Sequence, residues 1–385
     1  MQIPIFVEPN YRESIWARQT LEGILQESAH KKYKALMLED CDYTSIDLEA
    51  LFREEHRMVI LVGTSISWMP DALTFFAQNG VACILISYEP SESTAIRGTV
   101  RMDYVAAMYM LLTYLSGCGH NRIAMYGFNP NSSADVIKKS CFERWNRQHP
   151  HVTGKNTLFN RASLGQCYAE FARVRSNFDA VICANDIVAA SLLRRLKQDG
   201  VRVPEDLFLV SFGNSALSQR VRPSITSVSL DNVEKGRQAV NLYAYLYRQE
   251  PSTSVSVRVR SNLTVRQSTD MIPPDAAAMD ASQPHMDYAN AVDFYSDPEA
   301  QQILNAESML NACDETDLRF LHGLLSGKTY EALENELFLS SSALRYRLKR
   351  MMTISGCKNR AELGDFLALC ESLGLFSGCM EQPSP

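Results

Sequence analysis

The chain has 385 residues, 46% of them hydrophobic and 21% charged, and a formal net charge of −6. Its length predicts two or three domains, and its acidic balance excludes a surface that is basic throughout, although a local basic patch can still bind nucleic acid. No apolar run is long enough to cross a membrane, and the first residues, MQIPIFVEPNYRE, lack the pattern of a signal peptide. The ten cysteines include no C-x-x-C pair, which favours reduced thiols in the cytoplasm over disulfides or a metal site.

Short β-rich runs alternate with helical patterns over the first two thirds of the chain. The predicted strands are 3–7, 35–38, 58–63, 82–87, 122–126, 180–184 and 208–212. The predicted helices are 14–30, 70–78, 104–115, 133–148, 163–174, 187–198 and 233–247. This alternation predicts an α/β fold with parallel sheets and right-handed crossovers. The pattern alone leaves open whether the strands form one large sheet or two smaller lobes.

The composition changes after residue 266. Residues 267–296 contain three prolines and five aspartates but no Lys or Arg, and they show neither helical nor strand periodicity. This composition predicts an acidic flexible linker, with an interaction segment as the alternative. Structure resumes at Asp297, a predicted N-cap that is followed by a proline. Helical patterns at 298–311, 315–325, 330–337, 341–353 and 360–372 predict an all-α domain over 297–373, followed by a frayed tail over 374–385.

A basic stretch without any acidic residue lies near the end of this acidic chain. Between residues 340 and 361 the bases are Arg345, Arg347, Lys349, Arg350, Lys358 and Arg360. The helix predicted after the N-cap Ser340 has an apolar stripe made of Leu344, Leu348, Met351 and Met352. A helix with one buried and one basic face, behind a first helix, is the arrangement of a helix-turn-helix, whose second helix lies in the major groove of DNA. The alternative is a solvated basic face on an ordinary helical bundle.

Residues 314–369 resemble the LuxR-type (GerE-like) helix-turn-helix domain. The matching positions are Gly327, Glu331, Ala332, Leu337, Ser340, Leu344, Gly356, Asn359, Arg360, Glu362 and Leu363. The resemblance implies that 341–352 is the recognition helix and that the helix over 360–372 dimerises. The implied DNA-binding residues are Ser341, Ser342, Arg345, Tyr346, Arg347, Lys349, Arg350 and Lys358. The departures from the family pattern are Ala343, Arg347 and Ser355, together with the acidic Glu334 and Glu336 of the preceding helix.

The first 270 residues resemble the ligand-binding core of LacI/GalR-type regulators, a type I periplasmic-binding-protein fold, and the predicted sensor domain spans 1–266. The resemblance lies in GVACILIS, YLSGCGHNRIAMYG, FDAVICANDIVAASLLRRLKQDGVRVPEDLFLVSFGN, RPSITSV and LTVRQST. It implies two α/β lobes joined by hinge strands, with an effector in the cleft. The first lobe would comprise about 1–101 and 230–255, and the second about 102–229. In the family a DNA-binding domain precedes this core, and we expect the C-terminal domain to take its place here.

The resemblance also implies which residues bind the effector. They are Glu8, Asn10, Trp16, Ser65, Trp68, Tyr88, Lys138, Asn185, Asp186 and Asn214. Gly213 stands where the family usually has an aspartate that accepts from sugar hydroxyls, so an aromatic or acidic metabolite is as good a candidate as a sugar. Several of these residues have structural alternatives: Asp186 as a helix cap, Trp68 and Tyr88 as packing residues, and Lys138 as a solvated base. The whole core could also serve in assembly with a degenerate cleft.

These observations together predict a cytoplasmic bacterial transcription regulator. It would bind double-stranded DNA as a homodimer and respond to a small effector, with no membrane contact. No Gly-rich phosphate loop, H-E-x-x-H or G-x-S-x-G motif is present, so we expect neither catalytic residues nor a cofactor. A secreted solute-binding protein and a phosphorelay response regulator fit less well. The alternative from another class is a protein-interaction module whose helical domain does not bind DNA.

Overall fold

The computed structural model describes residues 1–38, 43–52, 57–88, 95–149, 158–159, 163–250, 252–270 and 297–376. The chain divides into two compact units. The first comprises 1–114, 129–151 and 230–262, and the second comprises 115–128, 152–229 and 263–385. Each unit is built around one mostly parallel sheet, so the predicted α/β class with two lobes is confirmed. None of the described helices is long and apolar enough to span a membrane.

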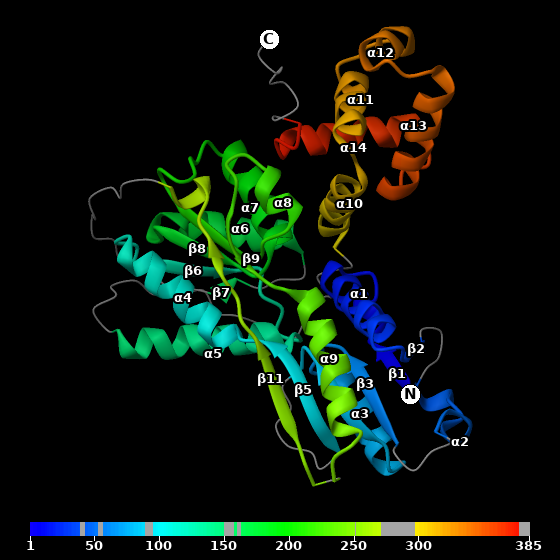
Figure 1. Cartoon of the computed structure of the whole chain (residues 1–385). Coiled ribbons are helices and arrows are strands. Elements are labelled where there is room, and N and C mark those ends of the chain that lie inside the picture. Colours follow the sequence, from blue (N-terminus) through cyan, green and yellow to red (C-terminus); the bar gives the residue numbers. More distant parts are fainter. Residues whose placement is uncertain are drawn as a thin grey trace. The chain divides into compact units, whose positions relative to one another are not determined.

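The first lobe contains a parallel sheet that has six strands among the described residues, in the order β11-β5-β4-β3-β1-β2 (Figure 1). The strands are β1 (Gln2–Val7), β2 (Lys34–Met37), β3 (Met58–Val62), β4 (Ala82–Ile86), β5 (Ile96–Met102) and β11 (Val255–Val259). The helices are α1 (Ile15–His30), α2 (Leu48–Leu51), α3 (Trp68–Gln78), α5 (Ser133–Gln148) and α9 (Asn232–Leu246). Helix α4 (Tyr104–Gly117) starts in this unit and ends in the second.

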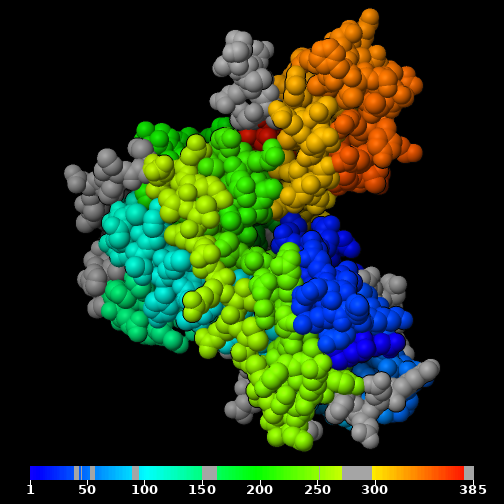
Figure 2. Space-filling view, in the orientation of Figure 1, coloured from blue at the N-terminus to red at the C-terminus, as the bar shows by residue number. Residues whose placement is uncertain are grey.

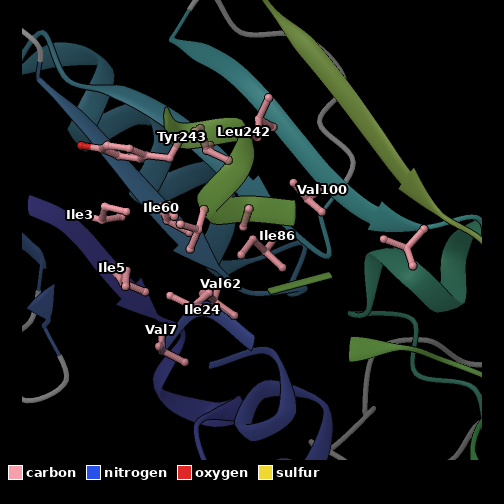
Figure 3. Close-up of a cluster of buried hydrophobic side chains, with 14 of the residues drawn as sticks. Ile3, Ile5, Val7, Ile24, Ile60, Val62, Ile86, Val100, Leu242 and Tyr243 are labelled. Carbon is pink, nitrogen blue, oxygen red and sulfur yellow. The ribbon is translucent and has the colours of Figure 1, made fainter. Parts of the chain in front are cut away.

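Both faces of this sheet are buried at β1, β3 and β4, which is why these strands are mostly continuous apolar runs in the sequence. Side chains alternate between the two faces along each strand. One face carries Ile3, Ile5, Ile60 and Val62, which pack with α1 and α9 (Figure 3). The opposite face carries Phe6, Val59, Leu61 and Leu85, which pack with α3. The carboxyl ends of β1, β3 and β4 therefore lie along one edge of a rigid layer.

The second lobe has its own sheet, in the order β12-β10-β9-β8-β6-β7 within the described residues. The strands are β6 (Ile123–Tyr126), β7 (Leu158–Phe159), β8 (Ala180–Cys183), β9 (Phe208–Gly213), β10 (Thr226–Ser229) and β12 (Leu263–Thr264). Only β12 runs antiparallel to its neighbour in that described sheet. The helices are α6 (Leu164–Val174), α7 (Asp186–Gln198) and α8 (Ala216–Arg220).

The helical segment that follows belongs to the same compact unit as the second lobe. Its helices are α10 (Pro298–Ala312), α11 (Glu315–Leu325), α12 (Tyr330–Leu337), α13 (Ser341–Ser355) and α14 (Arg360–Ser372). Each starts after a side chain that caps it, namely Asp297, Asp314, Thr329, Ser340 and Asn359. These local signals explain why the predicted helix bounds differ from the observed ones by two residues at most.

Two predicted boundaries are wrong. The linker range expected over 267–296 is wrong at its start, because Gln267–Thr269 form a short 3-10 helix in which Ser268 donates to the Leu209 carbonyl oxygen and accepts from the Thr226 N–H at 2.8 Å. Residues 271–296 lie outside the described part of the chain. The tail range expected from 374 is also wrong at its start, because Leu375 and Phe376 are buried, while 377–385 lie outside the described residues.

The lobe borders differ from the predicted ones as well. Helix α5, predicted to belong to the second lobe, groups with the first. Strand β11 extends the first lobe to Val259, beyond the expected border at 255, because it pairs along the whole length of β5.

Two glycines allow α1 and α9 to pack with their backbones in close approach. A Cβ atom added at Gly236 would lie 2.0 Å from the Thr20 carbonyl oxygen, and one added at Gly23 would lie 1.9 Å from that of Val233. We therefore expect Gly236→Ala to lower the free energy of unfolding by about 1–3 kcal/mol in urea titrations followed by circular dichroism. Gly364→Ala, in the open interior of α14, is the matched control and should stabilise by about 0.5–1 kcal/mol. Equal effects of the two changes would contradict the close packing of α1 and α9.

Candidate effector and DNA-binding sites

Three effector candidates lie just after the strands of the first lobe, as predicted from their positions in the sequence. Glu8 follows β1, Ser65 follows β3 and Tyr88 follows β4. Glu8 is fully buried, and its Oε2 accepts from the N–H groups of Thr64 at 2.9 Å and Ser65 at 3.1 Å. The Ser65 hydroxyl donates to the other oxygen. Glu8 and Ser65 therefore order the β3–α3 turn and are not exposed to a ligand.

The aromatic candidates differ in accessibility. Tyr88 is buried in the cluster under α3, so its packing role is the one observed. Trp68, at the start of α3, is half-buried with its ring 5.7 Å from that of Tyr43. Trp16, in the first turn of α1, is half-buried beside Tyr11, and Asn10 is exposed. Asn10, Trp16 and Trp68 are thus the first-lobe candidates that retain accessible surface.

Lys138 is neither solvated nor available as a free cation. Its Nζ atom lies 2.9 Å from Asp135 Oδ1 and 5.0 Å from the centre of the Tyr104 ring, and its side chain is buried in α5. An anionic ligand at this position would have to compete with Asp135. Binding of the effector by Lys138 therefore stays a prediction, while its ion pair with Asp135 is observed.

Sequence reasoning missed Lys235, which is 1% exposed in α9 beside Trp16. Its Nζ atom donates to Ser87 Oγ at 2.7 Å and to Asn232 Oδ1 at 2.9 Å, and it lies 5.0 Å from the centre of the Trp16 ring. Burial lowers the pKa of Lys235 from its ordinary value of 10.5 to about 7. The sequence could have predicted this burial, because Lys235 shares a helical face with the apolar residues Ala239, Leu242 and Leu246.

The second-lobe candidates follow β8 and β9, and two of them, Asp186 and Asn214, share the hydroxyl of Ser227 as a hydrogen-bond partner. Asn185 caps α7 by accepting from the N–H groups of Ile187 and Val188, so the capping role belongs to Asn185 and not to Asp186. Asp186 is buried and accepts from the Ser227 hydroxyl and the Ser215 N–H, both at 2.7 Å, and from the Ser211 hydroxyl. Burial raises the pKa of Asp186 above its ordinary value even though these hydrogen bonds act in the opposite direction.

Gly213 and Asn214 shape the same edge of the second lobe. A Cβ atom added at Gly213, where φ is +135°, would lie 2.7 Å from Asp186 Oδ2. The aspartate of the family pattern therefore does not fit here while Asp186 keeps its position. Asn214, with φ of 52°, donates its N–H to Ser227 Oγ at 2.9 Å, and its side-chain oxygen accepts from Arg266. Asn185 and Asn214 are the half-exposed members of this group.

Helix α13 buries most of the apolar stripe that the sequence predicted. Leu344, Leu348 and Met351 are buried, while Met352 is half-buried. Helices α12 and α13 contact each other, and Ser340 begins α13 by accepting from the Ala343 N–H. The predicted helix pair with a short turn is therefore present. In Figure 2, α12 and α13 (orange) form part of the surface on the face shown.

Two of the predicted DNA-binding arginines are held by α11 instead of projecting into solvent. Arg347 Nη1 lies 3.1 Å from Asp314 Oδ2 and also pairs with the buried Asp317. Arg350 lies 3.7 Å from Asp317 Oδ2 and donates to the Ala312 carbonyl oxygen. The hydrogen bonds that Arg347 donates to Asp317 and Asp314 raise its pKa. These two arginines position α13 on α11.

The remaining candidates form an exposed surface, which we call the α13 face. Ser342, Arg345, Tyr346 and Lys349 are exposed along one side of the helix, and no carboxylate lies among these four residues. Ser341 is half-buried, and Lys358 is exposed beyond the helix. Phe338, in the turn before α13, is 93% exposed with φ of 54° and was not predicted to be part of the site. Tyr346 is 70% exposed.

No cluster of three or more His, Cys, Asp or Glu side chains placed to hold a metal ion occurs within the described ranges. The described cysteines are free thiols, and five of them are buried: Cys83, Cys141, Cys167, Cys183 and Cys370. Cys41 and Cys379 lie outside the described residues.

The core is similar to a known domain family and to proteins named as transcription regulators. Residues 112–269 match the family described as periplasmic binding protein-like domain. The chain is similar to the NTD biosynthesis operon regulator NtdR of Bacillus subtilis, with 27% identity over 229 residues, which are 58% of this chain and 68% of that protein.

Two solved structures share the fold of the core. One is a putative transcriptional regulator LacI from Bacillus cereus subsp. cytotoxis, with a TM-score of 0.60 and 17% identity over 70% of this chain and 98% of the other. The second is the LacI family regulator CCPA of Weissella paramesenteroides with bound glucose, with a TM-score of 0.56 and 20% identity over 70% and 98%. The two lobes therefore have the periplasmic-binding-protein-like fold of LacI-type regulators, as the sequence predicted.

The buried Lys235 makes stability depend on pH in a defined direction. Between about pH 7 and its ordinary pKa the unfolded chain binds more protons than the folded one, so the stability of the first lobe rises with pH. Lys235→Met removes this dependence. The free energy of unfolding of the variant, relative to that of the natural protein, should therefore fall by about 1.4 kcal/mol per pH unit between about pH 7.5 and 9.5. Urea titrations at several pH values measure it, with the half-exposed Lys139→Met as the control. A constant difference would contradict a lowered pKa.

The ion pairs of α13 separate its arginines by role. Arg347→Ala should lower the free energy of unfolding of the helical segment by about 1–2 kcal/mol, because it leaves the buried Asp317 carboxylate with fewer donors. Arg345→Ala, two residues earlier and exposed, should change it by less than about 0.5 kcal/mol. Thermal unfolding of both variants measures the difference, and equal losses would show that Arg347 does not position α13.

Proposed function

We propose that the chain is a transcription regulator in which the two lobes bind a small molecule and the helices over 297–376 bind double-stranded DNA. Such a regulator would act in the bacterial cytoplasm as a homodimer, and the proposal includes no catalytic step. The observation that carries it is the α13 face, an exposed row of hydroxyl, aromatic and basic side chains on the second helix of a tight helix pair. Arginine and lysine on such a helix can contact base edges and phosphates in the major groove.

The division of roles among the bases of α13 makes the proposal more specific. Arg345 and Lys349 are one helical turn apart and exposed, so they would contact DNA, with Ser342 and Tyr346 on the same side. Arg347 and Arg350 would support the helix from behind through Asp317. Lys358, near the start of α14, would contact a phosphate of the DNA backbone. The likeness to LuxR-type domains supports this assignment.

The sensing role is supported by the likeness of the core to regulators of the LacI type. The relatives are named as transcription regulators, and one solved relative holds glucose. In this chain Glu8, Ser65, Lys138 and Asp186 are satisfied by internal partners. The predicted effector residues that keep accessible surface are Asn10, Trp16 and Trp68 in the first lobe, and Asn185 and Asn214 in the second. Aromatic and amide groups of this kind suit a polar small molecule, either a sugar or an aromatic or acidic metabolite.

A second function is favoured by one observation. Phe338 and Tyr346 expose large aromatic surface, and Glu331 and Glu336 are exposed on α12, which repels phosphates. Together they would suit a helical segment that binds a protein partner, with lobes that serve in assembly. This alternative predicts that removing positive charge from α13 leaves the affinity for DNA unchanged. The next experiment decides between the two proposed functions.

DNA binding is tested with duplexes enriched from genomic fragments by the full-length protein. Arg345→Ala and Lys349→Ala should each weaken binding, and a base-reading position should cost about 1–3 kcal/mol. A phosphate contact should instead reduce the slope of log affinity against log salt by about one. Arg202→Ala removes an exposed base from the second lobe and serves as the control. Unchanged affinity in both α13 variants would refute the assignment of α13 as the recognition helix.

A further inference from the structure

Helix α10 touches the second lobe and the DNA-binding helices at the same time. It contacts α7 and α8 of the lobe, and it contacts α13 and α14 of the helical segment (Figure 1). Ala300, Ile303, Ala306 and Met309 are buried in these contacts. A helix buried on both sides transmits displacement between the parts that it contacts, because packed interiors rearrange between discrete states and do not deform continuously.

The first turn of α10 is fixed to α7 by one carboxylate. Glu299 Oε1 accepts from Ser191 Oγ at 2.9 Å and from Arg194 Nη2 at 2.8 Å, while Oε2 accepts from Arg195. Burial alone would raise the pKa of Glu299, but the hydrogen bonds from Arg194 and Arg195 outweigh it, and the pKa lies below its ordinary value. Glu299 is therefore ionised at neutral pH and bridges two arginines that would otherwise repel each other.

A second carboxylate joins α10 to α6. Asp297 Oδ1 caps α10 by accepting from the N–H groups of Glu299 at 2.9 Å and Ala300 at 3.0 Å. Its Oδ2 accepts from the N–H of Leu164, the first residue of α6, at 3.1 Å. One buried side chain thus accepts from the first N–H groups of two helices, α6 in the lobe and α10 in the helical segment.

The other end of α10 holds the recognition helix. Asn305 Nδ2 donates to the Ser355 carbonyl oxygen at 3.1 Å, and Arg350 donates to the Ala312 carbonyl oxygen. Helix α7, which carries Ser191, Arg194 and Arg195, begins at Asn185 and Asp186 on the proposed effector edge. A continuous series of helices therefore runs from that edge through α7 and α10 to α13.

We propose that Asp297 and Glu299 form a latch that docks the DNA-binding helices on the second lobe, so that a change at the N-terminus of α7 reaches α13 through α10. This coupling rests on the proposed function, whereas the docking itself does not. Coupling of this kind is reciprocal. If the effector changes the affinity for DNA by some factor, DNA changes the affinity for the effector by the same factor.

The latch is tested by hydrogen exchange on the full-length chain. Glu299→Ala removes the bridge between Arg194 and Arg195, and Asp297→Asn keeps a helix cap but loses the charge. We expect the amides of α10 to exchange about tenfold faster in Glu299→Ala, and less so in Asp297→Asn, while those of β8 and β9 keep their rates. Glu49→Ala, which breaks an exposed pair with Arg57 in the first lobe, is the control and should leave α10 unchanged. Wild-type rates at α10 in both latch variants would overturn the docking.

The coupling is tested by adding the enriched duplex to the same proteins. In the natural chain DNA should slow exchange at the N-terminus of α7, and in Glu299→Ala the duplex should bind as before without this protection. Equal protection of α7 in the two proteins would overturn the coupling. If the natural chain binds no duplex, the proposed function is overturned, and the coupling with it. The hydrogen-exchange rates of the α10 amides without DNA still decide whether the docking is correct.

Discussion

A buried carboxylate must be given hydrogen-bond donors or a cation, and this requirement decides which of the candidate residues can meet another molecule. Glu8 takes the donors of the β3–α3 turn, and Asp186 takes those of three serines. Asp317 takes Arg347 and Arg350. Each part of the chain is thereby ordered around one acid, and the side chains that satisfy it are withdrawn from ligands. The candidate residues that remain accessible are neutral or basic, namely the amides and indoles of the lobes and the α13 face.

The same requirement explains how much could be predicted from the sequence. Helix bounds over 297–376 followed from caps and periodicity, which are local signals, and the apolar stripe of α13 was correct at Leu344, Leu348 and Met351. Strand β5 was missed because it contains Arg97 and Arg101. Arg97 is buried only because its guanidinium donates to the carbonyl oxygens of Gln249, Glu250 and Thr253, more than 150 residues away. No local pattern contains that information.

For the candidate sites, the sequence could predict the positions of the residues but not their partners. Positions after β1, β3, β8 and β9 were predictable, because parallel strands bring their carboxyl ends to one edge. The partners of those residues were not: Glu8 meets Ser65, and Arg347 meets Asp314, across long stretches of chain. The contacts between α10 and α7 were likewise not predictable, because Glu299 and Arg194 are about a hundred residues apart in the chain.

The central claim is that the chain binds DNA through α13, and one measurement tests it most directly. The full-length protein is used to select genomic fragments at low salt, and the affinity for any enriched fragment is then titrated with salt. The account predicts a shared motif, with affinity that falls steeply as salt rises because phosphate contacts release counterions. Recovery of no motif at low salt by a folded protein would contradict it and would favour a helical segment that binds another protein.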